Sequence, residues 1–304
     1  MKINNIYLGD CIQLLKEIED KSIDAIVSDP PYRYLKHKLD QEFDEDIFVK
    51  ECNRVVKDTG FVVLFGRGIP FYRLNTKLAD NDFVFKEEII WYKNMTSNPV
   101  LYLLRVHETI CILGRVKSNI NKCKIPYTEF RQYDLYKMEE DLNKICHSLD
   151  NPSKLNDLKQ LIQHNKYEYN RNQHNKHYIT IRTDLITVDR HVGLMKSLID
   201  GNREQSVIKM TPDHYTMKHP TQKPVRLMER LIQLVSHETN IILDPFMGGG
   251  STCIACKNIN RNYIGFEINE EYFNLAKDNL EKHQDNLFYQ GDNNEDTVEG
   301  EEAE

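Results

Sequence analysis

The sequence predicts a doubly wound α/β domain with a mainly parallel sheet and an inserted region near residues 118–204. Short apolar runs of the strand type alternate with segments whose apolar residues recur every three to four positions, which is the pattern of a parallel sheet covered by helices. The alternation stops at about Ser118, and the segment that follows is rich in Asn, Lys, His and Tyr. We therefore expect one large domain that carries an insertion.

The expected elements follow in chain order. The strands are Ile6–Leu8, Ile23–Ser28, Phe61–Phe65, Phe83–Trp91, Thr109–Leu113, Ile241–Leu243 and Tyr263–Glu267. The helices are Ile12–Ile18, Asp46–Lys57, Pro70–Leu78, Val225–Val235, Thr252–Asn258 and Glu270–Lys282, with weaker helical periodicity at Leu142–Ile162. Pro224 is tolerated before the first turn of a helix, and we interpret Gly60 as the stop of the helix that precedes it.

Charge is unevenly distributed along the 304 residues. The formal net charge is −7, and the last thirteen residues contain seven acids without Lys or Arg, so that residues 1–291 are formally neutral. Such a tail is typical of a disordered, solvated end. The composition argues against strong non-specific binding to nucleic acid, but it permits a DNA enzyme with a local basic face.

Membrane insertion and export are not expected. No apolar run approaches the ~18 residues of a membrane helix, and the N-terminus leads into no signal-peptide core. We expect a cytoplasmic protein whose seven cysteines are reduced. Cys253 and Cys256 have a Cys-x-x-Cys spacing, but no second pair accompanies them, so burial on a helix face explains them better than a metal, and no metal site is predicted.

The first motif, Asp29-Pro30-Pro31-Tyr32, directly follows the strand Ile23–Ser28. Two prolines hold the chain extended where open α/β sheets bind their ligands. The Asp29 carboxylate and the Pro30 carbonyl are two acceptors for the N–H bonds of an amine, and Tyr32 can stack on a base. Alone, the motif would also fit a tight turn.

The second motif runs from Leu243 to Thr252 and contains Phe-x-Gly-x-Gly between a strand and a helix. Glycines let the backbone pass close to a ligand, and no Lys-Ser/Thr pair follows them as in a phosphate loop. Glu267 ends the next strand, in the place of the acid that binds ribose hydroxyls in nucleotide-binding folds. The third motif, His219 to Pro224, opens a helix, where Lys223 can reach a carboxylate; alone it would be an ordinary helix start.

Together these motifs resemble the β class of amino DNA methyltransferases, over roughly residues 4–116 and 205–283. The resemblance implies a circularly permuted, Rossmann-like fold that uses S-adenosylmethionine and modifies double-stranded DNA. It implies catalytic roles for Asp29, Pro30, Pro31 and Tyr32. It implies that the cofactor contacts are Asp10, Lys223, Asp244, Phe246, Gly248, Gly250, Ser251 and Glu267.

The same resemblance divides the chain into a catalytic half at 1–117, an inserted target-recognition region at 118–204, a cofactor-binding half at 205–284 and an acidic tail at 285–304. The family's adenine enzymes tend to carry Asp at the first position of the tetrad and its cytosine enzymes Ser, so Asp29 favours adenine-N6 over cytosine-N4. The intact motifs argue against an inactive DNA-binding module. The target sequence, a homodimer and a cognate restriction endonuclease stay open.

Within the insertion, residues 164–182 interleave basic, aromatic and amide side chains with a single acid, Glu168. Arg, Asn and Gln read bases, while Lys positions on phosphates. The candidate DNA contacts are Lys166, Arg171, Lys176 and Arg182. A solvated loop is the competing interpretation.

A short echo also links the ends of the chain, because Tyr7-Leu8-Gly9-Asp10 resembles Tyr289-Gln290-Gly291-Asp292. One sheet position is available for the two copies. We expect Ile6–Leu8 to take it, since it is joined to the catalytic strand by a short connection.

Overall fold

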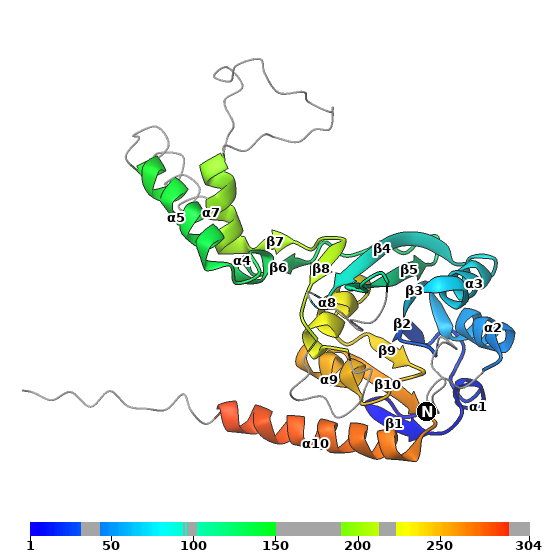
Figure 1. The fold of residues 1–304 in the computed structure, drawn as a ribbon. Coiled ribbons are helices and arrows are strands. Elements are labelled where there is room, and N and C mark those ends of the chain that lie inside the picture. Colours follow the sequence, from blue (N-terminus) through cyan, green and yellow to red (C-terminus); the bar gives the residue numbers. More distant parts are fainter. Residues whose placement is uncertain (32–42, 94, 96–101, 150–189, 213–222, 292–304) are drawn as a thin grey trace, which may run out of the picture. The chain divides into compact units, whose positions relative to one another are not determined.

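The computed structural model describes residues 1–31, 43–93, 95, 102–149, 190–212 and 223–291. They form two compact units, one made of Met1–Asn121 with Gln205–Glu304 and one of Lys122–Glu204. The first unit contains the large sheet, and the second is helical with a two-stranded ribbon (Figure 1).

The strands of the large sheet come from both ends of the chain. They are β1 (Asn5–Leu8), β2 (Ile23–Ser28), β3 (Val56–Gly66), β4 (Val84–Tyr92), β5 (His107–Gly114), β8 (Val207–Lys209), β9 (Ile241–Asp244) and β10 (Asn262–Glu267). Their order is β1-β10-β9-β2-β3-β5-β4-β8, and every pairing is parallel except those of β5 with its two neighbours. The predicted doubly wound, mainly parallel sheet is therefore confirmed.

The helices of this unit form two groups. The first comprises α1 (Cys11–Leu15), α2 (Glu45–Val55) and α3 (Gly68–Ala79), and the second α8 (Val225–Val235), α9 (Ser251–Asn258) and α10 (Glu270–Gly291). Val62 and Leu64 join the core beneath the first group, whereas their neighbours Val63 and Phe65 are buried outside that core. Successive side chains of a strand point to opposite faces, so the sheet is covered on both sides.

The N-terminal strand lies beside a strand from the C-terminal half. Leu8 is in register with Glu267, and the backbone N–H of Asn4 donates to the carbonyl of Tyr263 at 2.7 Å. The last turn of α10 contains residues 289–291, so the terminal copy of the echo forms no strand there. The prediction that the N-terminal copy fills the sheet position is confirmed.

Most predicted boundaries differ from the structure by one or more residues, and the differences at Gly60 and at the end of α10 correct an interpretation of the sequence. Gly60 does not stop a helix: α2 ends at Val55 and β3 begins at once, with Gly60 inside it. A Cβ at Gly60 would lie 2.7 Å from the carbonyl oxygen of Asp24, so the residue is small because β2 and β3 approach closely at an irregularity in their pairing. Helix α10 also continues to Gly291, past the predicted end at Lys282 and into the predicted tail.

The second unit is built on a buried carboxylate. Its elements are β6 (Lys124–Ile125), α4 (Tyr127–Phe130), α5 (Leu135–Leu149), α7 (Arg190–Asp200) and β7 (Asn202–Arg203). Asp141 on α5 accepts hydrogen bonds from Tyr127 and Lys144, each at 3.0 Å, and pairs with Arg131. These bonds tie α4 to α5, and α5 packs on α7.

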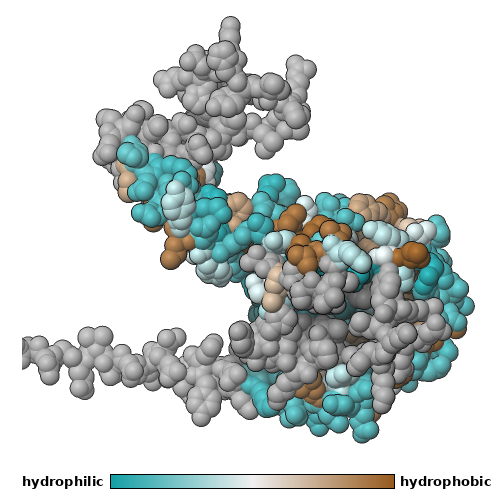
Figure 2. Space-filling model, viewed as in Figure 1, coloured by the Kyte–Doolittle hydropathy of each residue, from teal (hydrophilic) through white to brown (hydrophobic). Residues whose placement is uncertain are grey.

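The visible surface is mostly hydrophilic. Figure 2 shows apolar residues gathering over the β4 and β8 side of the sheet. The exposed apolar residues of these two strands are Val84, Phe85 and Val207. Among the described residues, each helix is too short or too polar to cross a bilayer.

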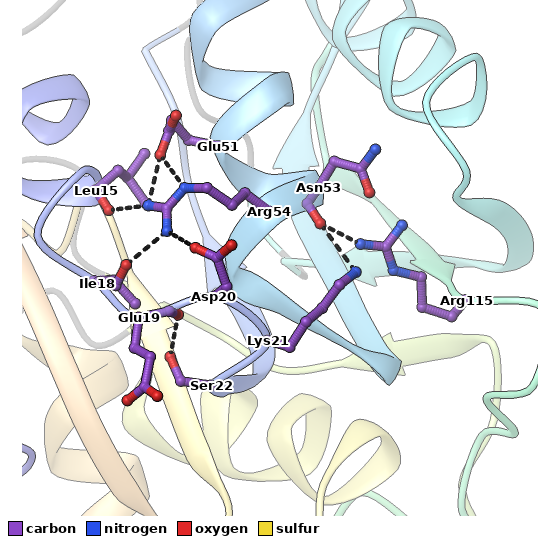
Figure 3. A network of polar contacts seen from close by, with 10 residues as sticks. All are labelled: Leu15, Ile18, Glu19, Asp20, Lys21, Ser22, Glu51, Asn53, Arg54 and Arg115. Atoms are coloured by element: carbon purple, nitrogen blue, oxygen red, sulfur yellow. Dashed lines mark hydrogen bonds and ion pairs between the residues drawn. The ribbon is translucent and has the colours of Figure 1, made fainter.

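One arginine fixes the connection between β1 and β2. Arg54 on α2 donates to the carbonyls of Leu15 at 2.8 Å and Ile18 at 2.7 Å, and it pairs with Glu51 and Asp20 (Figure 3). It thereby supplies a side-chain donor to two carbonyls at and beyond the end of α1, of which that of Leu15 also accepts the backbone N–H of Ile18 at 3.0 Å. Because α1 joins β1 to β2, Arg54 holds this connection against α2.

Arg54→Met should therefore lower the free energy of unfolding by about 2–3 kcal/mol, since it leaves acceptors and the Glu51 carboxylate without their donor. Urea denaturation followed by circular dichroism measures this change. The control is Asp58→Asn, which removes an exposed ion pair with Lys21 and should leave the free energy of unfolding close to that of wild type. Equal free energies of unfolding for the two variants would contradict the stabilising role given to Arg54.

Candidate active site

The predicted acids lie at the carboxyl ends of neighbouring strands. Glu267 ends β10, Asp244 ends β9 and Asp29 directly follows β2, and these three strands are adjacent in the sheet. Asp10 follows β1, which pairs with β10. Parallel strands end at the same edge, so the sheet order brings together residues that are more than two hundred positions apart in the sequence.

Asp244 anchors the glycine loop. Its carboxylate accepts hydrogen bonds from the Ser28 hydroxyl, the Thr252 hydroxyl and the backbone N–H of Phe246, the last at 3.1 Å. The side chain is buried, and burial raises the pKa of its carboxyl to about 6 against the opposing effect of these donors. In the structure, then, Asp244 joins β2, β9 and α9, and its contact with a cofactor stays a prediction.

The loop has a backbone that favours glycine. Gly248 has φ +51° and Gly250 has φ +83°, both in the left-handed region. A Cβ at Gly250 would also lie 3.1 Å from that of Ala276 on α10. Ser251 is buried at the start of α9, and its hydroxyl has no hydrogen-bond partner among the described residues. A buried donor without a partner at a glycine loop fits a site that a polar ligand completes.

Glu267 faces this loop. Its carboxylate accepts the backbone N–H of Gly248 at 3.0 Å and that of Asn269 at 2.8 Å, one on each oxygen. The side chain is half-buried, and burial raises the pKa of its carboxyl. Each oxygen retains a second lone pair, so the carboxylate can also accept two hydroxyl groups of a ligand.

Asp10 caps the N-terminus of α1. Its carboxylate caps α1 by accepting the backbone N–H of Ile12 at 2.9 Å and of Gln13 at 3.2 Å. The adjacent Gly9 donates its N–H to the carbonyl of Glu267 at 2.9 Å. Asp10 is therefore held beside the Glu267 strand end, as a cofactor contact requires, while its role in binding stays a prediction.

Asp29 belongs to a row of four charged side chains. Its carboxylate pairs with the ammonium of Lys223, which lies 3.4 Å from Glu108, and Glu108 pairs with Lys93. Burial raises the pKa of the Asp29 carboxyl to about 6, although Lys223 opposes this. Carboxylates on both sides raise the pKa of the Lys223 ammonium, which also lies 5.1 Å from the centre of the Phe65 ring.

Lys223 thus differs from its expected place. We expected it to meet the carboxylate of a bound amino acid, and in the structure it contacts two carboxylates of the chain itself, just before the start of α8. The prediction that it binds cofactor stays untested. Glu108 and Lys93 had no predicted role. The sequence signal that could have found these two residues is charge at strand ends, because Lys93 follows β4 and Glu108 is the second residue of β5.

Aromatic side chains close the other side of the loop. Phe246 packs against Phe43 and Phe48, with ring centres 5.0 and 5.6 Å away. Pro30 and Pro31 line a small pocket together with Phe43. The loop and the proline motif therefore share one apolar wall.

The Cys-x-x-Cys pair is part of the packing. Cys253 and Cys256 on α9 are completely buried. A Cβ at Gly265 of β10 would lie 2.9 Å from the Cys253 sulfur, so this thiol lies directly against the sheet.

Several predicted residues lie outside the described residues. They are Tyr32, residues 219–222 of the third motif, and the candidate DNA contacts Lys166, Arg171, Lys176 and Arg182. Their roles stay predictions from the sequence.

The strand order and the acids at the strand ends define a class, the Rossmann-like methyltransferases. Solved structures that share the fold include M1.HpyAVI and PvuII DNA methyltransferase. M1.HpyAVI, solved in complex with S-adenosylmethionine, aligns with a TM-score of 0.53 at 23% identity, covering 90% of this chain and 98% of that one. PvuII DNA methyltransferase, described as cytosine-N4-specific, aligns with a TM-score of 0.56 at 14% identity, covering 92% and 90%.

The family follows from the sequence. The model of the N6/N4 DNA methylase family matches residues 23–278, and the chain belongs to this family. Type II methyltransferase M.HinfI of Haemophilus influenzae is 26% identical over 306 residues, which cover 91% of this chain and 68% of that protein. The resemblance drawn from the three motifs is confirmed, and the cofactor of the family is S-adenosylmethionine.

The raised pKa of Asp244 predicts a pH effect on stability. Its carboxyl titrates near pH 6 in the folded protein and near 3.9 when unfolded. Between these values the folded protein holds a proton that the unfolded chain has released. The contribution of Asp244 to the free energy of unfolding therefore falls as pH rises from about 4 to 6, and is constant above.

Asp244→Asn removes this titration. Wild type should lose on the order of 3 kcal/mol relative to the variant between pH 4 and pH 7. Urea unfolding of both proteins across this range measures the difference between their free energies of unfolding. The contributions of the other titrating groups cancel in this difference. A difference that stays constant with pH would show that the buried carboxyl is not protonated in the folded state.

Proposed function

We propose that this enzyme transfers a methyl group from S-adenosylmethionine to the N6 amine of adenine in double-stranded DNA. The observation that carries the proposal is Asp29, a carboxylate at the first position of the Asp-Pro-Pro-Tyr motif, held at the end of β2 beside the glycine loop. A target base flips out of the duplex to reach such a site, because its amine is inaccessible inside the stack.

The cofactor fits the described residues. Glu267 offers two oxygens suited to the ribose hydroxyls, and the glycine loop lets the backbone approach the methionine part. The partnerless Ser251 hydroxyl adds a polar group at the same loop. When bound, S-adenosylmethionine supplies a methyl group on a positively charged sulfur.

Asp29 and Pro30 act on the base. An amine conjugated to a heteroaromatic ring is a poor nucleophile, and two acceptors for its N–H bonds favour the pyramidal geometry needed for attack. Positive charge develops on the nitrogen as the N–C bond forms, so a fixed carboxylate stabilises charge where it appears. We also propose Asp29 as the acceptor of the proton that the methylated amine releases. Tyr32 is proposed to stack on the base.

Cytosine-N4 is the second candidate. The permuted sheet is shared with the cytosine-N4-specific PvuII enzyme, so the fold is compatible with either base. Asp29 stands where the family's cytosine enzymes tend to carry Ser, and this favours adenine. The intact loop and motif argue against an inactive DNA-binding module.

Nucleoside analysis tests the base. The purified protein is incubated with S-adenosylmethionine and enzymatically amplified genomic DNA, which carries no modification, and the digested product is examined by mass spectrometry. The expected product is N6-methyldeoxyadenosine. N4-methyldeoxycytidine would instead identify the second candidate, and the absence of both would contradict activity on DNA.

We propose residues 164–182 as the part that reads the target sequence. Arg171→Ala should relax one position of the target at a cost of about 1–3 kcal/mol, whereas Lys176→Ala should weaken binding to all sequences alike. Sequencing of a methylated random DNA library measures both effects. If both variants keep the target-sequence preference and the DNA affinity of wild type, the interpretation of this segment as a solvated loop holds.

Asp29→Asn tests the catalytic role. Asparagine retains the size of the side chain and an oxygen that can accept from Lys223, whereas alanine would remove the nearer of the two partners of this buried ammonium and confound activity with folding. We expect the turnover rate to fall by about 10²–10³, while the affinity for S-adenosylmethionine, measured by calorimetry, changes little. Near-normal turnover would exclude Asp29 as the acceptor of the amine. Asp58→Asn is the surface control.

A further inference from the structure

The row Lys93–Glu108–Lys223–Asp29 contains a residue without an assigned role in the reaction. We propose that Glu108 is a positioning residue for methyl transfer, which takes over the Lys223 ammonium when the Asp29 carboxylate turns to the target amine. This inference rests on the proposed role of Asp29, and it holds for either base.

The geometry is asymmetric. One oxygen of Glu108 is taken by Lys93, whereas the other, Oε2, is buried without a hydrogen-bond partner and lies 3.4 Å from the Lys223 nitrogen. The same nitrogen makes a short hydrogen bond to Oδ2 of Asp29. Lys223 therefore has one carboxylate in close contact and a second acceptor within a small shift of its ammonium.

The elements around the row restrict that shift. Lys223 is 9% exposed and lies over the Phe65 ring of β3, and Lys93 lies 4.7 Å from the centre of the Trp91 ring. The Trp91 indole is fixed by a 2.8 Å hydrogen bond to the carbonyl of Met210. An aromatic ring thus lies beside each cation, and the described carboxylates within ion-pair distance of the Lys223 ammonium are those of Asp29 and Glu108.

The chemistry gives this arrangement a use. A carboxylate that holds an ammonium is a weaker acceptor for an amine, and the nearby positive charge opposes the charge that develops on the nitrogen. If Lys223 moves to Oε2 of Glu108, Asp29 gains an oxygen for the amine while Lys223 keeps a buried partner. If Glu108 had no charge, Lys223 would stay on Asp29, because a lone ammonium in the interior is costly.

A purely structural role predicts a different outcome. Buried ion pairs can often be replaced by apolar side chains at little cost in stability, so the pair of Glu108 and Lys93 need not be present for folding. A structural role would appear as a lower melting temperature and altered Michaelis constants, with turnover per folded molecule unchanged. A positioning role would lower turnover and leave the melting temperature and the Michaelis constants close to those of wild type.

The test uses the full chain, tritiated S-adenosylmethionine and amplified unmodified genomic DNA. Glu108→Gln should lower turnover 10- to 100-fold while the Michaelis constants for cofactor and DNA stay within about twofold. Glu88→Gln, on the exposed side of the neighbouring strand, is the matched control and should behave as wild type. Glu108→Asp, which keeps the charge, should recover part of the rate.

The double variant Glu108→Gln/Lys93→Met guards against misfolding, since it removes one positive and one negative charge and leaves no lysine without a partner. It should be as slow as the single variant. Wild-type turnover in the double variant would overturn the inference, as would a loss that appears only in melting temperature or Michaelis constants. An active Asp29→Asn variant would instead contradict the proposed role of Asp29 itself, so the two failures are distinguishable.

Discussion

The carboxylate of Asp244 is the interaction on which the site depends. It sits at the centre of the sheet edge and accepts donors from β2, from the glycine loop and from α9. A buried carboxylate is stable only when such donors surround it. The same bonds fix the end of β2, where Asp29 follows, and the start of α9, where Ser251 lies. One buried acid thus sets the distance between the proposed methyl donor site and the proposed amine site.

Charge balance is the second constraint. Three acids end neighbouring strands, and burial raises the pKa of Asp29, Asp244 and Glu267 alike. Each is compensated differently: Glu267 by backbone N–H groups, Asp244 by two hydroxyl groups and one backbone N–H, and Asp29 by an ammonium. Of the three, only Asp29 has a partner with a full charge, the Lys223 ammonium, and this side chain can move as a whole. Such a partner suits Asp29, because the proposed reaction changes the charge on the amine that Asp29 faces.

The permuted order of the chain explains how distant residues meet. β1 is the first strand in the sequence and pairs with β10, near the end. The chain thus begins at one edge of the sheet, crosses to the other through β2 and β3, and returns with β9 and β10. Arg54 holds the short connection that begins after the cap residue Asp10 and leads into β2, the strand that Asp29 follows.

The sequence by itself determined the alternation of strands and helices, the three motifs and the family, because apolar periodicity and glycine or proline positions are local. β2 and α8 match their predicted bounds. The tertiary structure decided what depends on neighbours in space. Gly60 is required by the close approach of β2 rather than by a helix end. Lys223 meets Asp29 and Glu108 instead of standing free, since pairing between residues more than a hundred positions apart leaves no trace in local pattern. Which charges share one buried space is set by strand order, and strand order is a property of the folded sheet.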